Sequence, residues 1–265
     1  MSSVLVYLHL GLGDHLMCHG IIREYAKKYS RVALFALPHN YESVAFMFRD
    51  LPNVEIIKAD DAGARKFIEE NKTKAAGERF DEVKIIGFEF LDRASGIPVE
   101  KQFYKIAGVP FEKKWDSFYV ERDLAKEQAL FDKIAPKSDY IFLHEDASRG
   151  YGVNRKRVRS DLPIIVADPK VAPNMFDYCT IIERAKEIHV FDSSFMFLVD
   201  CLQYSAPDQK LFIHRYARSN PTWKLPIMKK DWHILLVRNY GYGVIRYVYE
   251  RLFQAYNFYI IKSYK

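Results

Sequence analysis

The sequence predicts an α/β protein built from two parallel β-sheets that are covered by helices. Short apolar runs rich in β-branched residues alternate along the chain with segments of helical periodicity. The same alternation starts again after residues 108–110. Strands that alternate with helices need crossover connections, and crossovers place neighbouring strands parallel. A chain of 265 residues is long enough for two domains of ordinary size.

The first half begins with a strand, a glycine turn and a helix. The apolar run 4–10 is the strand, Gly11 to Asp14 form the turn, and the helical pattern continues to about Lys28. After it we expect strands at 32–37, 54–57 and 82–88, and helices at 41–49 and 62–76.

The second half repeats this order without any visible repeat of the sequence itself. After a linker or extended segment at 115–120, we expect strands at 140–144, 163–167, 188–191 and 210–214, and helices at 123–134, 176–186 and 193–202. The sequence therefore predicts two Rossmann-like domains that face a cleft, an N-terminal one over 1–112 and a C-terminal one over 113–265.

Composition narrows the class of protein. Hydrophobic residues make up 49% of the chain, as in a globular protein. The three cysteines are far apart, which argues against a disulfide framework or a zinc site and favours a reducing compartment, the cytoplasm. The N-terminus lacks a basic lead and a cleavage site, and no apolar stretch is long enough for a spanning helix.

The turn Gly11-Leu12-Gly13-Asp14 suits a phosphate or another anion. Glycines between a strand and a helix let backbone N–H groups approach an anion closely. Two departures argue against a dinucleotide: Leu16 stands where the third glycine would be, and Pro38-His39-Asn40 replaces the acidic end of the second strand. No Gly-Lys-Ser/Thr follows, so a P-loop is excluded.

This turn resembles the start of glycosyltransferase-B enzymes, especially the heptosyltransferase-like group. The resemblance implies that Asp14 is the catalytic base, which takes a proton from the acceptor hydroxyl. The alternative is that Asp14 only caps the first helix. His15 is a second catalytic candidate that contacts substrate beside the cleft. His15 and His19 lie one turn apart, but no third ligand accompanies them, so we expect no metal.

The loop that follows the strand 140–144 is strongly basic. From Arg149 to Arg159 it carries five cations and no anion. Guanidinium groups bind phosphate oxygens in pairs, so Arg149 and Arg155 are predicted diphosphate ligands, together with His144 and Asn154 of the same loop. A solvated basic loop or a nucleic-acid contact is the alternative.

The sequence Asp192-Ser193-Ser194 ends one predicted strand and begins a helix. Hydroxyl and free N–H groups at a helix start can bind an anion, although they can also act as ordinary caps. The arrangement resembles the donor half of glycosyltransferase-B enzymes, where such a turn holds the diphosphate. We therefore predict Asp192, Ser193 and Ser194 as donor-binding residues, with Gly11 and Gly13 facing them.

The segment 232–265 combines aromatic residues with lysines and arginines, and its apolar spacing predicts a helix with a wide apolar face. The resemblance implies that a terminal helix crosses back onto the first domain. An anionic membrane surface or a lipid-linked acceptor is the alternative partner, and nucleic acid or a partner protein is a further one.

The resemblance as a whole implies a metal-independent, inverting glycosyltransferase without a cofactor. Its partners would be a nucleotide-sugar donor and a glycan or lipid-linked acceptor, and we do not expect nucleic acid among them. A non-catalytic nucleotide- or RNA-binding protein is the main alternative, because the basic loop and tail suit it equally. An NAD-dependent enzyme is a third hypothesis. Leu16 in place of a third glycine, and the missing acidic residue at the end of the second strand, argue against it.

Overall fold

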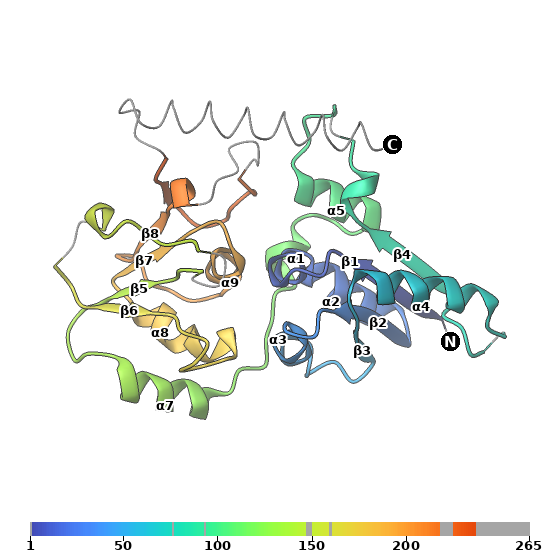
Figure 1. Cartoon of the computed structure of the whole chain (residues 1–265), viewed down its shortest axis with the longest axis horizontal. Coiled ribbons are helices and arrows are strands. Elements are labelled where there is room, and N and C mark those ends of the chain that lie inside the picture. Colours follow the sequence, from blue (N-terminus) through green and yellow to red (C-terminus); the bar gives the residue numbers. More distant parts are fainter. Residues whose placement is uncertain are drawn as a thin grey trace.

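The computed structural model describes residues 2–75, 77–92, 94–146, 150–158, 161–217 and 225–236. Within them each half of the chain forms one sheet (Figure 1). The strand order is β3-β2-β1-β4 in the first sheet and β6-β5-β7-β8-β9 in the second. All paired strands run parallel. The predicted α/β fold with two parallel sheets is confirmed.

The four strands of the first sheet and the helices between them follow the predicted order, whereas the helix Val99–Ala107 was not predicted. The strands are β1 Ser3–Leu8, β2 Arg31–Ala36, β3 Val54–Lys58 and β4 Glu82–Ile86. The helices are α1 Leu12–Met17, α2 His19–Lys28, α3 Tyr41–Met47, α4 Asp61–Thr73 and α5 Val99–Ala107. The single helix expected after the glycine turn is two helices that meet at Cys18, so α1 is short.

Alternating side chains of β1 are buried on opposite faces of this sheet. Val4, Val6 and Leu8 pack into the cluster that contains buried residues of α2, α3 and α5. Leu5 and Tyr7 pack with buried residues of α4. Because both faces are covered, the strand is a continuous apolar run rather than an alternating one, which is what made it recognisable in the sequence.

The second sheet has shorter strands. They are β5 Ile141–Leu143, β6 Ile164–Val166, β7 Glu187–Val190, β8 Lys210–Ile213 and β9 Trp232–Ile234. The helices are α7 Leu124–Ile134, α8 Cys179–Arg184 and α9 Ser194–Cys201, and the short 3-10 helices are η3 Arg155–Arg157, η4 Met175–Tyr178 and η5 Arg215–Ala217. The predicted helix 176–186 is thus η4 followed by α8, and β9 was not predicted.

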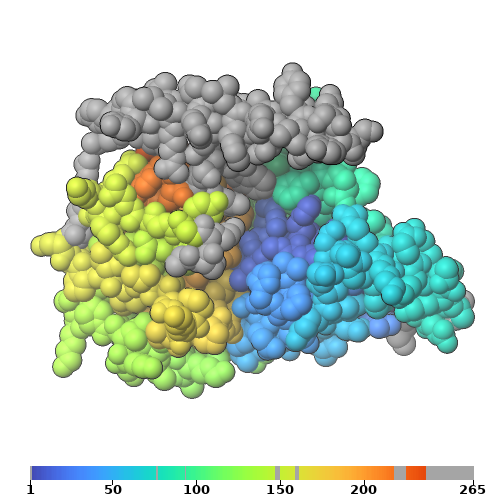
Figure 2. Space-filling view, in the orientation of Figure 1, coloured from blue at the N-terminus to red at the C-terminus, as the bar shows by residue number. Residues whose placement is uncertain are grey.

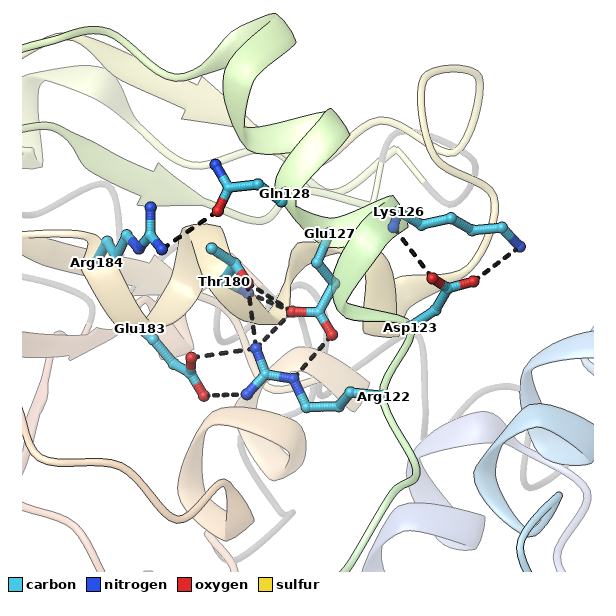
Figure 3. Close-up of polar contacts among 8 residues, drawn as sticks. All are labelled: Arg122, Asp123, Lys126, Glu127, Gln128, Thr180, Glu183 and Arg184. Atoms are coloured by element: carbon cyan, nitrogen blue, oxygen red, sulfur yellow. Dashed lines mark hydrogen bonds and ion pairs between the residues drawn. The ribbon is translucent and has the colours of Figure 1, made fainter.

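The linker between the sheets is fixed at both ends. It contains no strand but a short helix, α6 Lys113–Asp116, that packs against α2. Arg23 of α2 donates to the carbonyl of Tyr119 and forms a two-pronged ion pair with Asp50. Arg122 then forms ion pairs with Glu127 of α7 and Glu183 of α8 (Figure 3). The linker therefore has partners in both halves, since Trp115 of α6 also donates to Asp200 of α9.

The two halves are in direct contact (Figure 2). The rings of Phe46 on α3 and Phe176 in η4 stack with their centroids 5.5 Å apart. The segment between β8 and β9 also touches the first half, because the N–H of Ile227 donates to Glu100 of α5. The ammonium group of Lys114 in α6 donates to the carbonyl of Ile227, at 2.7 Å. Of the segment 232–265, in which a terminal helix was predicted, residues 232–234 form β9. Residues 237–265 lie outside the described residues.

Candidate functional site

A cavity of about 620 Å³ lies between the two sheets at the carboxyl ends of their strands. In sheets of these strand orders, ligands bind where the order reverses, next to β1 and β4 in the first sheet and next to β5 and β7 in the second. Both reversal points open into this one cavity. Its walls are formed by Gly11, Leu12, Gly13, Asp14, Met17, Leu37, His39, Asn40, Phe88, Asp146, Asp192, Ser193, Ser194 and Phe197.

The structure brings together the two helix starts that the sequence singled out. Gly11, Gly13 and Asp14 of the first half line the same cavity as Asp192, Ser193 and Ser194 of the second. A Cβ atom on Gly13 would lie 3.5 Å from the Phe197 ring and 3.9 Å from the backbone nitrogen of Ser194. Residue 13 of α1 therefore lies directly against the start of α9, where a Cβ atom would make ordinary van der Waals contact.

Asp14 is half-buried and lies in the first turn of α1. Gly11 occupies the N-cap position of α1, and Asp14 is the third residue of that helix. The carboxylate folds back over Gly11, because Oδ2 would lie only 2.7 Å from a Cβ atom on that residue. A carboxylate in this turn is favoured by the partial positive charge at the helix start.

Ser193 occupies the N-cap position of α9, but its hydroxyl forms no cap hydrogen bond. Its Oγ instead lies 3.1 Å from Nδ1 of His144, which follows β5. The imidazole of His144 stacks on Phe191 with an angle of 11° between the rings. His144 therefore orients Ser193 from behind, and His144 itself is not among the residues that line the cavity.

Asp192 is almost completely buried, with 4% of its surface exposed. Its Oδ2 accepts a hydrogen bond from Nη1 of Arg215, at 3.1 Å, in a charge pair. A buried carboxylate is costly unless a partner compensates its charge. The guanidinium of Arg215 supplies that compensation, so a charged group can face the cavity next to Ser193.

Of the predicted donor ligands that the structure describes, Asn154 and Arg155, like His144, do not line the cavity. The guanidinium of Arg155 pairs with Glu145 at 2.8 Å, and the Oδ1 atom of Asn154 accepts from the backbone N–H of Lys156. Neither residue lines the cavity. The local turn and the ion pair use their polar atoms within the loop itself. Arg149 lies outside the described residues.

His15 does not contact the cavity. Its side chain is fully buried, and neither ring nitrogen has a hydrogen-bond partner among the described residues. Burial lowers the pKa of His15 to about 4, so the ring is neutral near pH 7. The expectation of a substrate contact is corrected: its neighbour Asp14 faces the cavity, whereas His15 points into the core.

His19, one turn further, is also fully buried, and burial lowers its pKa well below the usual value. It stacks against Phe48, with ring centroids 5.1 Å apart. Within the described part of the chain, no group of three or more histidine, cysteine, aspartate or glutamate side chains could hold a metal ion. Nor does that part contain a helix both long and apolar enough to cross a membrane.

Four polar or aromatic residues of the cavity were not predicted: His39, Asn40, Phe88 and Asp146. Each follows the carboxyl end of a strand, namely β2, β4 or β5. The rule that ligands bind at this edge of a parallel sheet would have identified them. With Asp14 and Asp192, they give the cavity three carboxylates, and none of its described lining residues is a lysine or arginine.

Comparison with known proteins places this geometry among solved structures. No family model matches the chain, and none of the curated proteins matches its sequence. The structure of E. coli ADP-heptose lps heptosyltransferase II is 12% identical, with a TM-score of 0.50, over 90% of this chain and 92% of that one. The glycosyl transferase family 9 structure from Veillonella parvula DSM 2008 is 14% identical, with a TM-score of 0.55, over 92% and 88%. The chain thus has the two-sheet α/β fold of these glycosyltransferases, as its resemblance to the glycosyltransferase-B group implied.

Proposed function

We propose that the chain is a glycosyltransferase that moves a sugar from a nucleotide-sugar donor to a glycan or lipid-linked acceptor, without a metal ion. One observation carries the proposal: the start of α1, with Asp14, and the start of α9, with Ser193 and Ser194, line a single cavity between the two sheets. That juxtaposition gives a base on one wall and an anion-binding helix start on the other. The fold shared with solved glycosyltransferases supports the same assignment.

The diphosphate of the donor would lie at the start of α9. Backbone N–H groups of the first turn and the hydroxyls of Ser193 and Ser194 supply hydrogen bonds, and the helix dipole adds partial positive charge. These groups are fixed before the donor arrives, since His144 already orients Ser193. Preorganised donors of this kind stabilise charge that develops on a leaving group. Arg149 remains a predicted additional ligand.

Asp14 would act as the base. The acceptor oxygen forms a bond to the anomeric carbon of the donor sugar, while the bond from that carbon to the diphosphate oxygen breaks. The proton of the acceptor hydroxyl passes to the Asp14 carboxylate, and the electron pair of the broken bond leaves with the diphosphate. Attack opposite the leaving group inverts the configuration of the anomeric carbon. Orientation of the two substrates in one cavity contributes much of the rate.

The acceptor would lie against the first half. There Leu37, His39, Asn40 and Phe88 form a wall that combines apolar surface with hydrogen-bonding groups, next to Asp14. Sugar rings bind well to such walls, because their faces are apolar and their edges carry hydroxyls. The amide of Asn40 is oriented by its own hydrogen bond to the carbonyl of Leu10, at 3.1 Å.

A ligand panel followed by a product assay tests the proposal. ADP, UDP, GDP and NAD are each added to the full chain, and the thermal midpoint is measured, because a bound ligand stabilises the folded state. We expect one nucleoside diphosphate to raise the midpoint and NAD to leave it unchanged. The matching nucleotide-sugar should then be consumed with release of that diphosphate when acceptor sugars are added. Stabilisation by NAD alone, or by none of the four, would contradict the proposal.

A further inference from the structure

Arg215 lies directly behind the cavity without lining it. It follows β8, the strand next to β7, so its backbone lies beside the turn that carries Asp192. Its Nη1 atom donates to Oδ2 of Asp192 at 3.1 Å. The side chains are 14% and 6% exposed, so this ion pair is largely shielded from water.

The segment around Arg215 is held on both sides. The preceding residue, His214, is fully buried, and its Nε2 lies 2.8 Å from Nδ1 of His189 on β7. The Nδ1 atom of His214 lies 2.8 Å from the hydroxyl of Tyr216, the residue that follows Arg215. The Tyr216 hydroxyl also accepts the backbone N–H of Asn154, at 3.0 Å. These contacts fix the backbone of η5, and with it the origin of the Arg215 side chain.

A shielded ion pair of this kind has a definite consequence for its carboxylate. Loss of the cation would remove the compensation that Arg215 gives the buried Asp192 charge, together with the hydrogen bond to Oδ2 that orients the carboxylate. With Arg215 present, the charge pair holds the Asp192 carboxylate in one orientation. An ionised carboxylate only accepts hydrogen bonds, so it can bind hydroxyl groups but repels a phosphate.

We propose that Arg215 is a positioning residue that holds Asp192 in place to bind hydroxyl groups of the donor's sugar, and so sets specificity for that sugar. The inference rests on the proposed function and extends it. It divides the donor between two neighbouring features: the diphosphate at the start of α9, and the sugar at Asp192. Arg215 acts through Asp192 and does not itself touch the donor.

Calorimetric titration separates the two parts of the donor. The wild type and the variants Arg215→Gln, Arg215→Lys and Asp192→Asn are titrated with ADP, UDP and GDP, and with ADP-glucose, UDP-glucose and GDP-mannose. For the nucleotide that binds, we expect Arg215→Gln to weaken the nucleotide-sugar roughly tenfold, as for the loss of a charge-assisted hydrogen bond. The free diphosphate should change less than about twofold, and Arg215→Lys should recover part of the loss because it restores the cation.

The double variant shows whether Arg215 acts through Asp192. When Asp192→Asn is already present, Arg215→Gln should weaken the nucleotide-sugar by less than about twofold more, because the two changes disrupt one interaction. Fully additive effects would overturn the inference. An equal loss for the diphosphate and the nucleotide-sugar would also overturn it, since Arg215 would then bind the diphosphate.

Two controls keep the outcomes distinct. Arg31→Gln removes an arginine that is ion-paired with Glu55 on the exposed edge of the first sheet, and it should not change the affinity for either ligand. The thermal midpoint of each variant shows whether it folds, and Arg215→Lys provides a second variant if Arg215→Gln does not. If the wild type binds none of the six compounds, the proposed function fails, and this inference fails with it. Additive effects, or an equal loss for the diphosphate and the nucleotide-sugar, would overturn this inference and leave the proposed function in place.

Discussion

The two halves of the molecule reach the cavity by different means. The first half presents the glycine-lined start of α1, a helix of six residues that carries Asp14, beside a wall of side chains that follow β2 and β4. The second half presents side chains that are each held from behind, Ser193 by His144 and Asp192 by Arg215. Under the proposed function, the second half would bind the donor with side chains that are already oriented, and the first half would supply the base.

The two sheets also differ in what covers their faces. The first sheet is packed with helices on both faces. One face of the second sheet is covered instead by a small cluster formed by Ile141 and Leu143 with Val153 and Val158 of the basic loop. That loop therefore serves as structural cover for the sheet, which explains why its polar groups are directed to partners such as Glu145 rather than to the cavity.

The largest effect on turnover is expected for a substitution of Asp14. Asp14→Asn keeps the size of the side chain but cannot accept the acceptor proton, so kcat should fall about 10²- to 10⁴-fold, with the affinity for the donor nearly unchanged. Steady-state kinetics at saturating donor measures this. Asp60→Asn is the control, because Asp60 caps α4 through the N–H of Gly63 and does not line the cavity. Full turnover by Asp14→Asn would show that the first half does not deliver the base.

A matched pair at Gly13 sharpens the claim that the helix starts face one shared space. In Gly13→Ala the added Cβ would make ordinary contacts, the nearest at 3.5 Å, and we expect donor affinity within about threefold of wild type. The longer side chain in Gly13→Leu would enter the gap toward Phe197 and Ser194, so donor affinity should fall at least about tenfold. Calorimetric titration with the nucleotide-sugar measures both variants. Equal affinities would mean that the donor binds elsewhere.

His15 predicts a moderate effect on stability and none on turnover. Its pKa is lowered to about 4 by burial, so the folded state resists the proton that the unfolded chain takes up below about pH 6.5. The free energy of unfolding of the wild type should therefore fall as pH drops from 7 to 5. His15→Leu should remove up to about 2 kcal/mol of that fall.

Urea unfolding at pH 7 and pH 5 measures the effect, with His39→Gln as a control that removes an exposed histidine. An unchanged pH dependence in His15→Leu would contradict the assignment of His15 to the core. A large loss of turnover at pH 7 would restore it as a catalytic residue.

The smallest effect is expected at Arg155. Because its guanidinium pairs with Glu145 on a partly exposed surface, Arg155→Gln should cost less than about 1 kcal/mol of stability. The KM for the donor should change less than about twofold. Thermal unfolding and steady-state kinetics measure the two quantities. A tenfold rise in that KM would mean that the basic loop reaches the diphosphate, and the second half would then bind the donor through mobile cations as well as through its fixed frame.

The sequence was sufficient for the strands other than β9 and for the two helix starts, because buried parallel strands are continuous apolar runs and glycine or serine turns follow them directly. It was insufficient where a side chain's direction decides the outcome. Asp14 and His15 are neighbours on α1, yet one lines the cavity and the other is in the core. The periodicity also did not reveal that α1 ends at Cys18, where a second helix begins.

Partners distant in sequence were also beyond prediction. Arg155 belongs to the most basic stretch of the second half, but the pairing with Glu145 across a loop determines where its charge is used. Conversely, no sequence pattern indicated a role for Arg215, because only the adjacent placement of β7 and β8 brings it to Asp192. The order of strands in a sheet arises from tertiary packing, and a single sequence does not specify it.

A crystal structure with the nucleoside diphosphate selected by the ligand panel tests the central claim most directly. The account predicts phosphate oxygens within hydrogen-bonding distance of the Ser193 and Ser194 hydroxyls and of backbone N–H groups at the start of α9, with Asp14 across the cavity. Phosphates bound on the outer surface of the loop 150–158, with the cavity between α1 and α9 empty, would contradict it.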